Sequence, residues 1–459
     1  MKGVSPRSFP ASGWPEPVKK AIRTLENAGW ECWVVGGCVR DAAMGLTPHD
    51  WDLASSAPPE QVIAAFPHCR LNLAGQKHGT VGVLLDGQML EITTFRQDGG
   101  YSDFRHPDAV TFTSSLREDL ARRDFTVNAM ALHPRYGFYD PFNGLSDIKH
   151  KRLRAVGDPV RRMQEDPLRI LRGLRFFSRL ELTPDSETAK AFHSCGPMLS
   201  RISRERVFTE LNGMLCGENV LEVLLDYPDV LAAAIPELAP MQGFNQHTRY
   251  HNYDVWGHTA YAVAAVSPKP LLRWVMLLHD IGKPGRFTMD ESGTGHFKGH
   301  AALSAAMGEE ILRRLTMPKI DRKRAVELIR WHDAPIRPDR PHLAFWLRTL
   351  GKEQFFRLIE VKRADNRAQN RQVSDRTEEL DRLEQAAFAL LAENPPLTPR
   401  ELAISGDDLR AAGFAGPKLG AVLRRLTAGA ARGDYPNEKE ALLQAALRWK
   451  KGDVSDGKD

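Results

Sequence analysis

Residues 33–55 read WVVGGCVRDAAMGLTPHDWDLAS, and this stretch has the pattern of a strand, a glycine turn, a helix and a second strand. A short apolar run ends at Gly36 and Gly37, an amphipathic segment follows, and the second strand carries Asp50 and Asp52. Residues two apart in a strand point to the same face. We therefore expect the two aspartates to present paired carboxylates on one face, while the apolar residues beside them point into the core.

The residue types in this stretch suit the transfer of a nucleotide. Two carboxylates on one face can hold Mg²⁺, a cation that prefers oxygen ligands. Glycines let backbone N–H groups approach a triphosphate closely, at the start of a helix whose N-terminal end favours anions. A glycine pair alone is more often only a turn, and two aspartates are often a solvated strand end, so the combination and its order carry the interpretation.

The motif GGxVRD at residues 36–41, followed by DxD at residues 50–52, resembles the first motif of the tRNA nucleotidyltransferase and bacterial poly(A) polymerase family, within the polymerase-beta-like nucleotidyltransferases. The resemblance implies an α+β fold, in which a head with a mixed sheet and helices is followed by all-α neck, HD and tail domains. It also implies that Asp50 and Asp52 hold two Mg²⁺ ions, one at the primer 3′-hydroxyl and one at the triphosphate. The nucleotide contacts that it implies come from Gly36, Gly37 and Arg40.

The composition indicates a multidomain globular protein. With 459 residues the chain is long enough for about three domains. Its 42% hydrophobic and 26% charged residues are typical of soluble globular proteins, and no apolar stretch approaches the roughly 18 residues that span a bilayer. The first residues lack the apolar core of a secretory signal, and five cysteines without CxxC spacing suggest reduced thiols. We expect a cytoplasmic protein without a membrane segment or a disulfide framework.

The net charge of +5 is modest, but the basic residues are clustered. Runs of arginine and lysine occur at residues 122–123, 149–154, 161–162, 169–179, 201–206 and 319–324. Such patches suit phosphate backbones, although any single run is more often a solvated face.

Two alternating runs, residues 79–85 and 88–95, flank an Asp-Gly turn and predict a hairpin that extends the sheet. Glu91 in the second run is either an exposed strand residue or a third carboxylate at the metal site, a role that the family gives to a carboxylate on a neighbouring strand. Residues 96–113 contain glycines and a proline without a sustained period, so they predict a mobile loop that resembles the family's flexible loop.

The segment RRDFTVNAMA at residues 122–131 resembles a second family motif, in which arginine and asparagine contact the phosphates and sugar of the incoming nucleotide. The resemblance implies nucleotide contacts from Arg123, Asp124 and Asn128. The alternative interpretation is an amphipathic helix with a charged start.

Residues 161–180 have the apolar spacing of one helix. Within them, EDxxRxxR at residues 165–172 places two acidic residues four and three positions before Arg169, which alone predicts only a common and weak salt bridge. The segment also resembles the family's base-reading motif, which implies that Asp166 and Arg169 pair with the edges of cytosine or adenine, beside Arg172. Ser203 then predicts the N-cap of a supporting helix, whose Arg204 we expect to contact RNA.

Histidines and aspartates are spread over five predicted helices in the second half of the chain. They are the ligand types of a divalent transition-metal site, and their series resembles the HD-superfamily metal-dependent phosphohydrolases, which use one or two metals to hydrolyse phosphoesters. The resemblance implies a core ligand set of His258, His279, Asp280 and Asp365, with His300 and His332 as added ligands. Imidazole ligands favour Ni²⁺, Co²⁺, Mn²⁺ or Zn²⁺ over Mg²⁺. The alternative is a degenerate domain that is kept for its shape.

After a break at Asn394-Pro395-Pro396, residues 404–426 resemble the C-terminal tail of tRNA nucleotidyltransferases with an HD domain. A glycine turn near Lys418 could offer donors to an RNA phosphate, and the alternative is a helix-turn-helix packing element. The motifs predict a head at residues 1–150, a neck at 151–215, an HD domain at 216–375 and a tail at 376–459.

The motifs together identify the chain as a member of the bacterial class II tRNA nucleotidyltransferases with an HD domain. Membership implies addition of CCA to the tRNA 3′ end with CTP and ATP, and HD-domain hydrolysis of 2′,3′-cyclic phosphates or phosphomonoesters. Poly(A) polymerase, or an enzyme that adds only CC or only A, stays open because those motifs overlap. The retained loop at residues 96–107 argues against a CC-only enzyme, although its Phe104 and His106 weaken that argument. The chain could instead belong to another class of protein, an HD phosphohydrolase whose inactive head binds RNA. The intact carboxylates of the head argue against this alternative.

Overall fold

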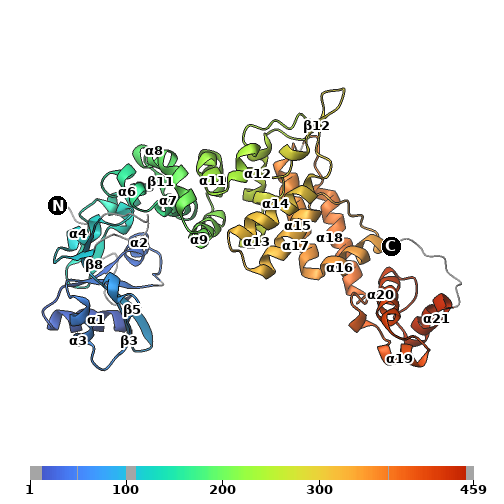
Figure 1. Ribbon diagram of the computed structural model, residues 1–459, viewed down its shortest axis with the longest axis horizontal. Helices are drawn as coiled ribbons and strands as arrows, with labels where there is room; N and C mark the ends of the chain where they lie inside the picture. The colour runs from blue at the N-terminus through green and yellow to red at the C-terminus, as the bar shows by residue number, and fades with distance from the viewer. Residues whose placement is uncertain (1–12, 49, 100–109, 371, 451–459) are drawn as a thin grey trace. The chain divides into compact units, whose positions relative to one another are not determined.

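Figure 1 shows a computed structural model of the protein, which describes residues 13–48, 50–99, 110–370 and 372–450. The chain divides into two compact units, with the boundary between Ala239 and Pro240. The first unit contains a mixed sheet and several helices, and the second is almost entirely helical. The predicted α+β fold, a sheet-containing head followed by helical domains, is confirmed, whereas the division into four domains stays a prediction.

The head is built on a seven-stranded sheet with the order β3-β4-β5-β2-β1-β8-β9. Strand β2 runs parallel to β5 and antiparallel to β1, so the sheet is mixed. The strands are β1 (Cys32–Val35), β2 (Asp52–Ser55), β3 (Arg70–Asn72), β4 (Thr80–Leu85), β5 (Gln88–Thr94), β8 (Ala131–His133) and β9 (Gly137–Tyr139). The predicted hairpin is the β4–β5 pair.

Helices cover the sheet because their apolar residues recur on one side. In α1 (Glu16–Asn27) the buried positions include Val18, Ile22 and Leu25, which lie at helical spacing. They join a core cluster that also contains residues of the sheet and of α3 (Pro59–Ala65). Each large aliphatic side chain buried in this way contributes about 1.5–3 kcal/mol.

The short helix and the second strand of the opening motif form as predicted, with one correction. Helix α2 (Gly37–Ala43) follows the glycine pair, but β2 begins at Asp52, so Asp50 lies just before the strand. Trp51 and Leu53 are buried, as the alternation predicts. Strand β2 begins at Asp52 and not at Asp50 because its pairing with β1 ends at the pair Val35–Asp52.

The prediction of a mobile loop over residues 96–113 is corrected at both ends. Strand β6 (Arg96–Asp98) pairs with β7 (Val110–Phe112) in a small antiparallel sheet. Residues 100–109, which include Phe104 and His106, lie outside the described residues.

The single helix predicted over residues 161–180 is wrong. The chain forms α6 (Pro159–Glu165) and α7 (Leu168–Leu180), and between them Asp166 has extended backbone angles, with φ −143° and ψ 100°. Pro167 explains the break, because a proline ring disfavours helical angles in the residue before it. Arg169 is therefore in the first turn of a new helix.

The rest of the first unit is mainly helical, with one short parallel pair of strands, β10 (Arg152–Leu153) and β11 (Thr183–Pro184). Its helices are α4 (Leu116–Ala121), α5 (Gly144–Lys149), α8 (Ser186–Cys195), α9 (Arg204–Leu215), α10 (Val220–Asp226) and α11 (Pro228–Ala234). Ser203 lies at the N-cap position of α9, as predicted, although its side chain makes no capping hydrogen bond.

The second unit has a helical bundle followed by three more helices near the end of the described chain. The bundle is α12 (Val255–Ala265), α13 (Pro270–Leu278), α14 (His300–Arg314), α15 (Lys319–Trp331), α16 (Arg340–Leu350), α17 (Lys352–Ala368) and α18 (Thr377–Ala392). The predicted break at Asn394 separates it from α19 (Gly406–Ala411), α20 (Pro417–Arg432) and α21 (Lys439–Lys450). Across the described ranges, no helix combines the length and apolarity needed to cross a membrane. All five cysteines are free thiols.

Gly173 provides a test of how α7 packs against the head. A Cβ atom at this position would lie 2.3 Å from the ring of Phe192 and 2.9 Å from the ring of Phe125. Gly173→Ala should therefore overfill the contact and destabilise the protein by about 1–3 kcal/mol. Urea unfolding of the parent and the variant measures this difference.

Gly420→Ala in α20 is the matched control, since its Cβ would meet only the flexible guanidinium of Arg424, at 3.5 Å. Alanine should stabilise that helix by up to about 1 kcal/mol. Equal effects of the two substitutions would contradict the tight packing of Gly173.

Candidate active site and metal centre

The opening motif places a glycine directly beside two charged groups. Gly36 has a left-handed φ of +80°, and a Cβ there would lie 3.1 Å from Nη1 of Arg123 and 3.7 Å from Oδ2 of Asp52. Only glycine combines this backbone conformation with this close approach. The backbone of the turn thus borders both a guanidinium and a carboxylate.

Three carboxylates of the head lie on or beside two adjacent strands in the middle of the sheet. Asp52 and Glu91 are neighbours across the parallel pair β2–β5, and Asp50 lies two positions before Asp52, the first residue of β2. Desolvation by the surrounding protein raises the pKa of Asp52, as do the carboxylates of Glu91 and Asp50, while Arg123 opposes the rise. A divalent cation would relieve this repulsion, and carboxylate oxygens are the ligands that Mg²⁺ prefers.

The head carboxylates are more widely spaced than a preformed metal cage. Among the residues that the structure describes, the groups of three or more ligand atoms within 4.8 Å of one another both lie in the second unit. The strand register places Glu91 beside Asp52, which is compatible with a role as the third carboxylate. That role stays a prediction.

Asp119 is a buried residue of α4 that the motifs did not single out. It accepts hydrogen bonds from Nε of Arg122 at 3.0 Å and from Nη2 of Arg123 at 3.3 Å. Burial opposes its ionisation, but the two arginines outweigh burial and lower its pKa. Its spacing of three and four residues before the arginines was the available sequence signal.

The second motif connects the head to α7 through an ion pair. Arg172 donates from Nε and Nη2 to Oδ2 of Asp124, at 2.9 Å and 2.7 Å. The other oxygen of Asp124 accepts from Asn128, whose own amide oxygen accepts from Arg40 at 2.8 Å. Burial disfavours the charge on Asp124, but Arg172 outweighs this effect and holds the pKa of that carboxyl well below its usual range.

The two base-reading candidates contact different neighbours. Asp166 accepts from Nη2 of Arg206 at 2.7 Å, and Arg169 donates from Nη1 to Oε2 of Glu165 at 2.6 Å. The predicted salt bridge at Arg169 therefore forms, but with Glu165 and across the break between α6 and α7. Arg204, the predicted RNA contact, lies outside the cavity that Arg206 lines.

Many of the residues described above line one cavity of about 430 Å³. Its lining includes Asp52 and all nine predicted nucleotide-binding residues, namely Gly36, Gly37, Arg40, Arg123, Asp124, Asn128, Asp166, Arg169 and Arg172. Sequence reasoning missed the ring of Phe176, over which the guanidinium carbons of Arg40, Arg172 and Arg175 lie at 5.1, 5.6 and 4.9 Å. The aromatic face stabilises these cations and orients them in the cavity.

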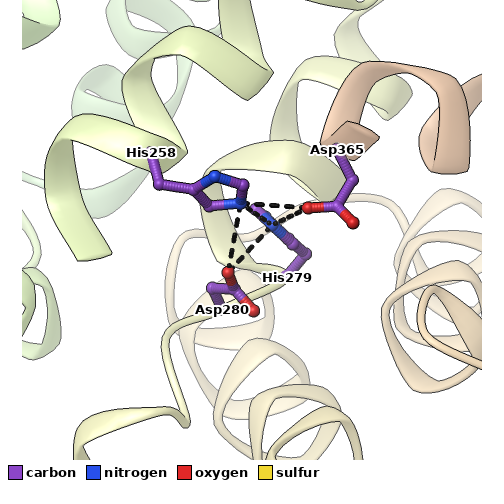
Figure 2. Close-up of side chains that lie close together, drawn as sticks. All are labelled: His258, His279, Asp280 and Asp365. Atoms are coloured by element: carbon purple, nitrogen blue, oxygen red, sulfur yellow. Dashed lines mark hydrogen bonds and ion pairs between the residues drawn. The ribbon is translucent and has the colours of Figure 1, made fainter. Parts of the chain in front are cut away.

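The predicted HD ligands converge in the second unit (Figure 2). His258 comes from α12, His279 and Asp280 follow α13, and Asp365 comes from α17. The Nε2 atoms of the two histidines are 3.3 Å apart, and Oδ1 of Asp365 lies 3.0 Å from Nε2 of His258. These separations are those of ligand atoms around a single metal ion.

A second group shares Asp280 with the first. Nε2 of His300 lies 3.3 Å and Nε2 of His332 lies 3.7 Å from Oδ1 of Asp280, whereas its Oδ2 faces His258 and His279. The carboxylate thus has one oxygen toward each group, which is the arrangement of a ligand that bridges two ions.

The histidines of both groups are oriented in the same way. The Nδ1 atoms lie near backbone carbonyl oxygens, at 3.3 Å for His258, 2.7 Å for His279, 2.9 Å for His300 and 2.7 Å for His332. A proton on Nδ1 leaves Nε2 as a lone-pair donor, and this second hydrogen bond is the usual support of a metal-ligating histidine.

The electrostatics of this cluster also suit a cation. Burial disfavours the imidazolium of His279, but Asp280 and Asp365 outweigh burial and raise its pKa to about 10. Both oxygens of Asp280 are buried without a hydrogen bond, although Nζ of Lys283 lies 2.7 Å from Oδ2. The residues therefore fit a divalent metal, which would take the place of a proton between them.

The metal cluster borders a cavity of about 490 Å³, which sequence reasoning did not describe. His251 lines it, and its ring meets that of His258 edge to face, with centroids 4.7 Å apart. Tyr250 and Lys298 also line this cavity. In the sequence, the signal for a place of His251 at this site was its position seven residues before His258.

Three segments of the chain match known protein families. Residues 32–154 match the Poly A polymerase head domain, residues 181–241 match the probable RNA and SrmB-binding site of polymerase A, and residues 250–370 match the HD domain. The fold and the two sites thus define a nucleotidyltransferase head in one chain with a helical HD domain.

Known relatives show which nucleotidyltransferases this chain is similar to. A CCA-adding enzyme of Levilactobacillus brevis is 34% identical over 432 residues, which cover 94% of this chain and 97% of that enzyme. A CCA-adding enzyme of Leuconostoc mesenteroides subsp. mesenteroides is 48% identical over 203 residues, 44% of this chain and 50% of that enzyme. The crystal structure of the Bacillus stearothermophilus CCA-adding enzyme in complex with CTP matches with a TM-score of 0.71 and 28% identity, over 95% of this chain and 98% of that one.

The chain belongs to the CCA-adding enzyme family and is a nucleotidyltransferase, which confirms the family identified from the motifs.

Proposed function

We propose that the head cavity binds CTP and ATP and that the protein uses them, with Mg²⁺, to add CCA to tRNA 3′ ends. The observation that carries this proposal is the single cavity lined by Asp52 and all nine predicted nucleotide-binding residues. The CTP in the related Bacillus stearothermophilus structure supports a cavity of this kind for the nucleotide.

Asp50, Asp52 and Glu91 are the residues that would hold Mg²⁺, beside the β2–β5 pair. When bound there, Mg²⁺ would neutralise the triphosphate and favour attack by the primer 3′-hydroxyl. Arg123, which Asp119 holds beside Asp52, would bind the phosphates, and Asn128 would contact the sugar. Most of the rate would then come from positioning and electrostatics.

The choice of base follows from hydrogen-bond chemistry. Cytosine and adenine each present an amino donor next to a ring-nitrogen acceptor, whereas uracil and guanine present the reverse pattern. The Asp166 carboxylate accepts from an amino group, and the Arg169 guanidinium donates to a ring nitrogen. This pair would therefore accept CTP and ATP and reject UTP and GTP, with protein groups serving as the template.

The tail and neck are proposed to bind the tRNA backbone. Lys418 is exposed in the first turn of α20, after Gly416, whose φ is +64°. Together with Arg204 of α9, it offers cations that suit phosphates. A packing role for the tail helices is the alternative.

For the HD cluster we propose hydrolysis of phosphoesters, with 2′,3′-cyclic phosphates and phosphomonoesters as substrates. Asp280 would bridge two ions, with His258, His279 and Asp365 on one side and His300 and His332 on the other. A bound transition metal such as Ni²⁺, Co²⁺, Mn²⁺ or Zn²⁺ would activate water for attack on phosphorus. Blocked RNA ends could then be repaired before extension.

Asp52→Asn should lower nucleotide addition by about a thousandfold, because it removes one charge from the Mg²⁺ site. The assay incubates purified protein with tRNAs that end at the discriminator base, at C and at CC, with each nucleotide separately. The parent should extend all three tRNAs to CCA. Extension that stops after CC, adds only A, or continues as poly(A) would instead support the alternative transferases, and no extension would support an inactive head.

Asp86→Asn is the control for this substitution, since Asp86 lies in the exposed turn of the β4–β5 hairpin and pairs with Lys20 at the surface. It should retain full activity. Comparable CMP incorporation by Asp52→Asn and the parent would end the metal-site assignment.

Arg169→Ala should relax the choice of nucleotide by about 10- to 100-fold, because a bidentate contact of this kind supplies about 1–3 kcal/mol of discrimination. Incorporation of UTP or GTP relative to CTP and ATP, measured with single nucleotides, gives the ratio. Arg179→Ala, an exposed arginine in the last turn of the same helix, should leave the ratio unchanged. Unchanged selectivity in Arg169→Ala would show that this residue serves only as the salt-bridge partner of Glu165.

His279→Ala should abolish metal-dependent hydrolysis and leave CCA addition intact, because the two sites use different residues and different metals. Cyclic and linear phosphates are assayed with each metal, and metal content is measured after dialysis. His342→Ala, which changes a half-buried histidine of α16 paired with Asp339, should lose neither metal nor activity. Absence of metal-dependent turnover in the parent would favour a purely structural HD domain.

A further inference from the structure

Arg162 of α6 lies outside the predicted motifs, yet its guanidinium contacts the elements on both sides of the nucleotide cavity. Only 13% of its side chain is exposed. Nε donates to the carbonyl oxygen of Val156 at 3.1 Å, and Nη2 donates to that of Ala121 at 2.8 Å. Nη1 donates to the carbonyl oxygen of Arg122 at 3.0 Å and to Oε2 of Glu165 at 2.9 Å.

On the head side, these contacts hold the end of α4. Ala121 is its last residue and Arg122 is its C-cap, so their carbonyl oxygens lack partners within the helix. Arg162 supplies donors to both. The next residue along the chain is Arg123, whose Nη2 is held by Asp119 of the same helix, at 3.3 Å. A displaced α4 terminus would therefore move the phosphate-binding guanidinium away from Asp52.

On the neck side, Arg162 holds the base-reading arginine. Oε2 of Glu165 accepts from Nη1 of Arg162 at 2.9 Å and from Nη1 of Arg169 at 2.6 Å. Arg169 also donates to the carbonyl oxygen of Arg162 at 2.9 Å. The carbonyl oxygen of Arg122 accepts from Arg162 and, at 3.4 Å, from Arg169, so one backbone group joins both sides.

We propose that Arg162 is a positioning residue that holds Arg123 and Arg169 at a fixed separation, and thereby couples phosphate binding to base selection. The inference rests on the proposed function, in which Arg123 binds phosphate and Arg169 reads the base. Arg162 itself does not line the nucleotide cavity. It donates to the carbonyl oxygen of Arg122, the residue before Arg123, and also to the carboxylate of Glu165, which orients Arg169.

The contacts of Arg162 require the shape of a guanidinium and not only its charge. Its planar fork directs several N–H groups at acceptors on different segments, whereas a lysine ammonium is a compact charge on a flexible stem. Arg162→Lys should therefore keep the cation and lose the coupling. Arg162→Met keeps the apolar stem and removes every donor.

Arg161 is the matched control on the same helix. Its side chain is 84% exposed, and its Nε lies 3.8 Å from Oε1 of the same Glu165. Arg161→Met removes one positive charge from the same neighbourhood and touches none of the carbonyl contacts described above.

The experiment measures kcat and KM for CTP and ATP, the selectivity against UTP and GTP, and the thermal unfolding of each variant. Misplacement of reacting groups by about 1 Å can cost about a hundredfold in rate. Arg162→Met and Arg162→Lys should lower kcat for CTP and ATP by about 10- to 100-fold and lower the selectivity by about tenfold or more. Arg161→Met should match the parent in every measurement.

A purely structural role predicts a different result. If Arg162→Lys unfolds at a lower temperature but keeps the parental selectivity, or if both Arg162 variants behave like Arg161→Met, the proposal is overturned. If Arg162→Met does not fold, Arg162→Lys decides between these outcomes. Unchanged selectivity in Arg169→Ala would refute the base-reading assignment itself, whereas relaxed selectivity there with parental behaviour in Arg162→Lys would refute only the coupling.

Discussion

The nucleotide site of the head depends on the ion pair between Asp124 and Arg172. The two residues are 48 positions apart, one in the second motif of the head and one on α7. Asp124 is buried, so without Arg172 it would leave a charge uncompensated inside the protein. Because the pair fixes α7 against the head, the residues proposed to read the base and those proposed to bind the phosphates border one cavity.

Around this pair the site is held by arginines that contact protein before any nucleotide arrives. Asp119, Asp124, Glu165 and Glu210 each accept from one or more guanidinium groups, and Phe176 supports three more contacts through its face. Such pairing lowers the cost of holding many cations in a small space, since each positive charge has a nearby partner. A triphosphate therefore meets cations that are already oriented, which is the condition for catalysis by electrostatic preorganisation.

The second unit also gathers ionisable side chains in a small space, but there they are histidines and aspartates instead of arginines. The buried carboxylate of Asp280, the half-buried carboxylate of Asp365 and four histidines lie together. The histidine Nδ1 atoms all face backbone carbonyls, so lone pairs converge on the space between them. Carboxylate oxygens such as those of the head suit Mg²⁺, whereas imidazole nitrogens such as those of the HD cluster suit transition metals. The metals proposed for the two sites therefore differ in kind, and the sites would not compete for the same ion.

Residue type and local spacing alone determined much of this protein. The sequence was sufficient for the glycine turn, the position of Asp52 on a strand, the β4–β5 hairpin and the histidines and aspartates that cluster in the HD domain, because those features are encoded over a few positions or by uncommon residue types. The tertiary structure decided which distant partners meet. Arg206 rather than Arg204 contacts Asp166 from 40 positions away, and Arg162 reaches the end of α4 from 41 positions away. Such contacts depend on how separate segments pack, and a helical period shows which face a residue occupies but not what lies opposite it.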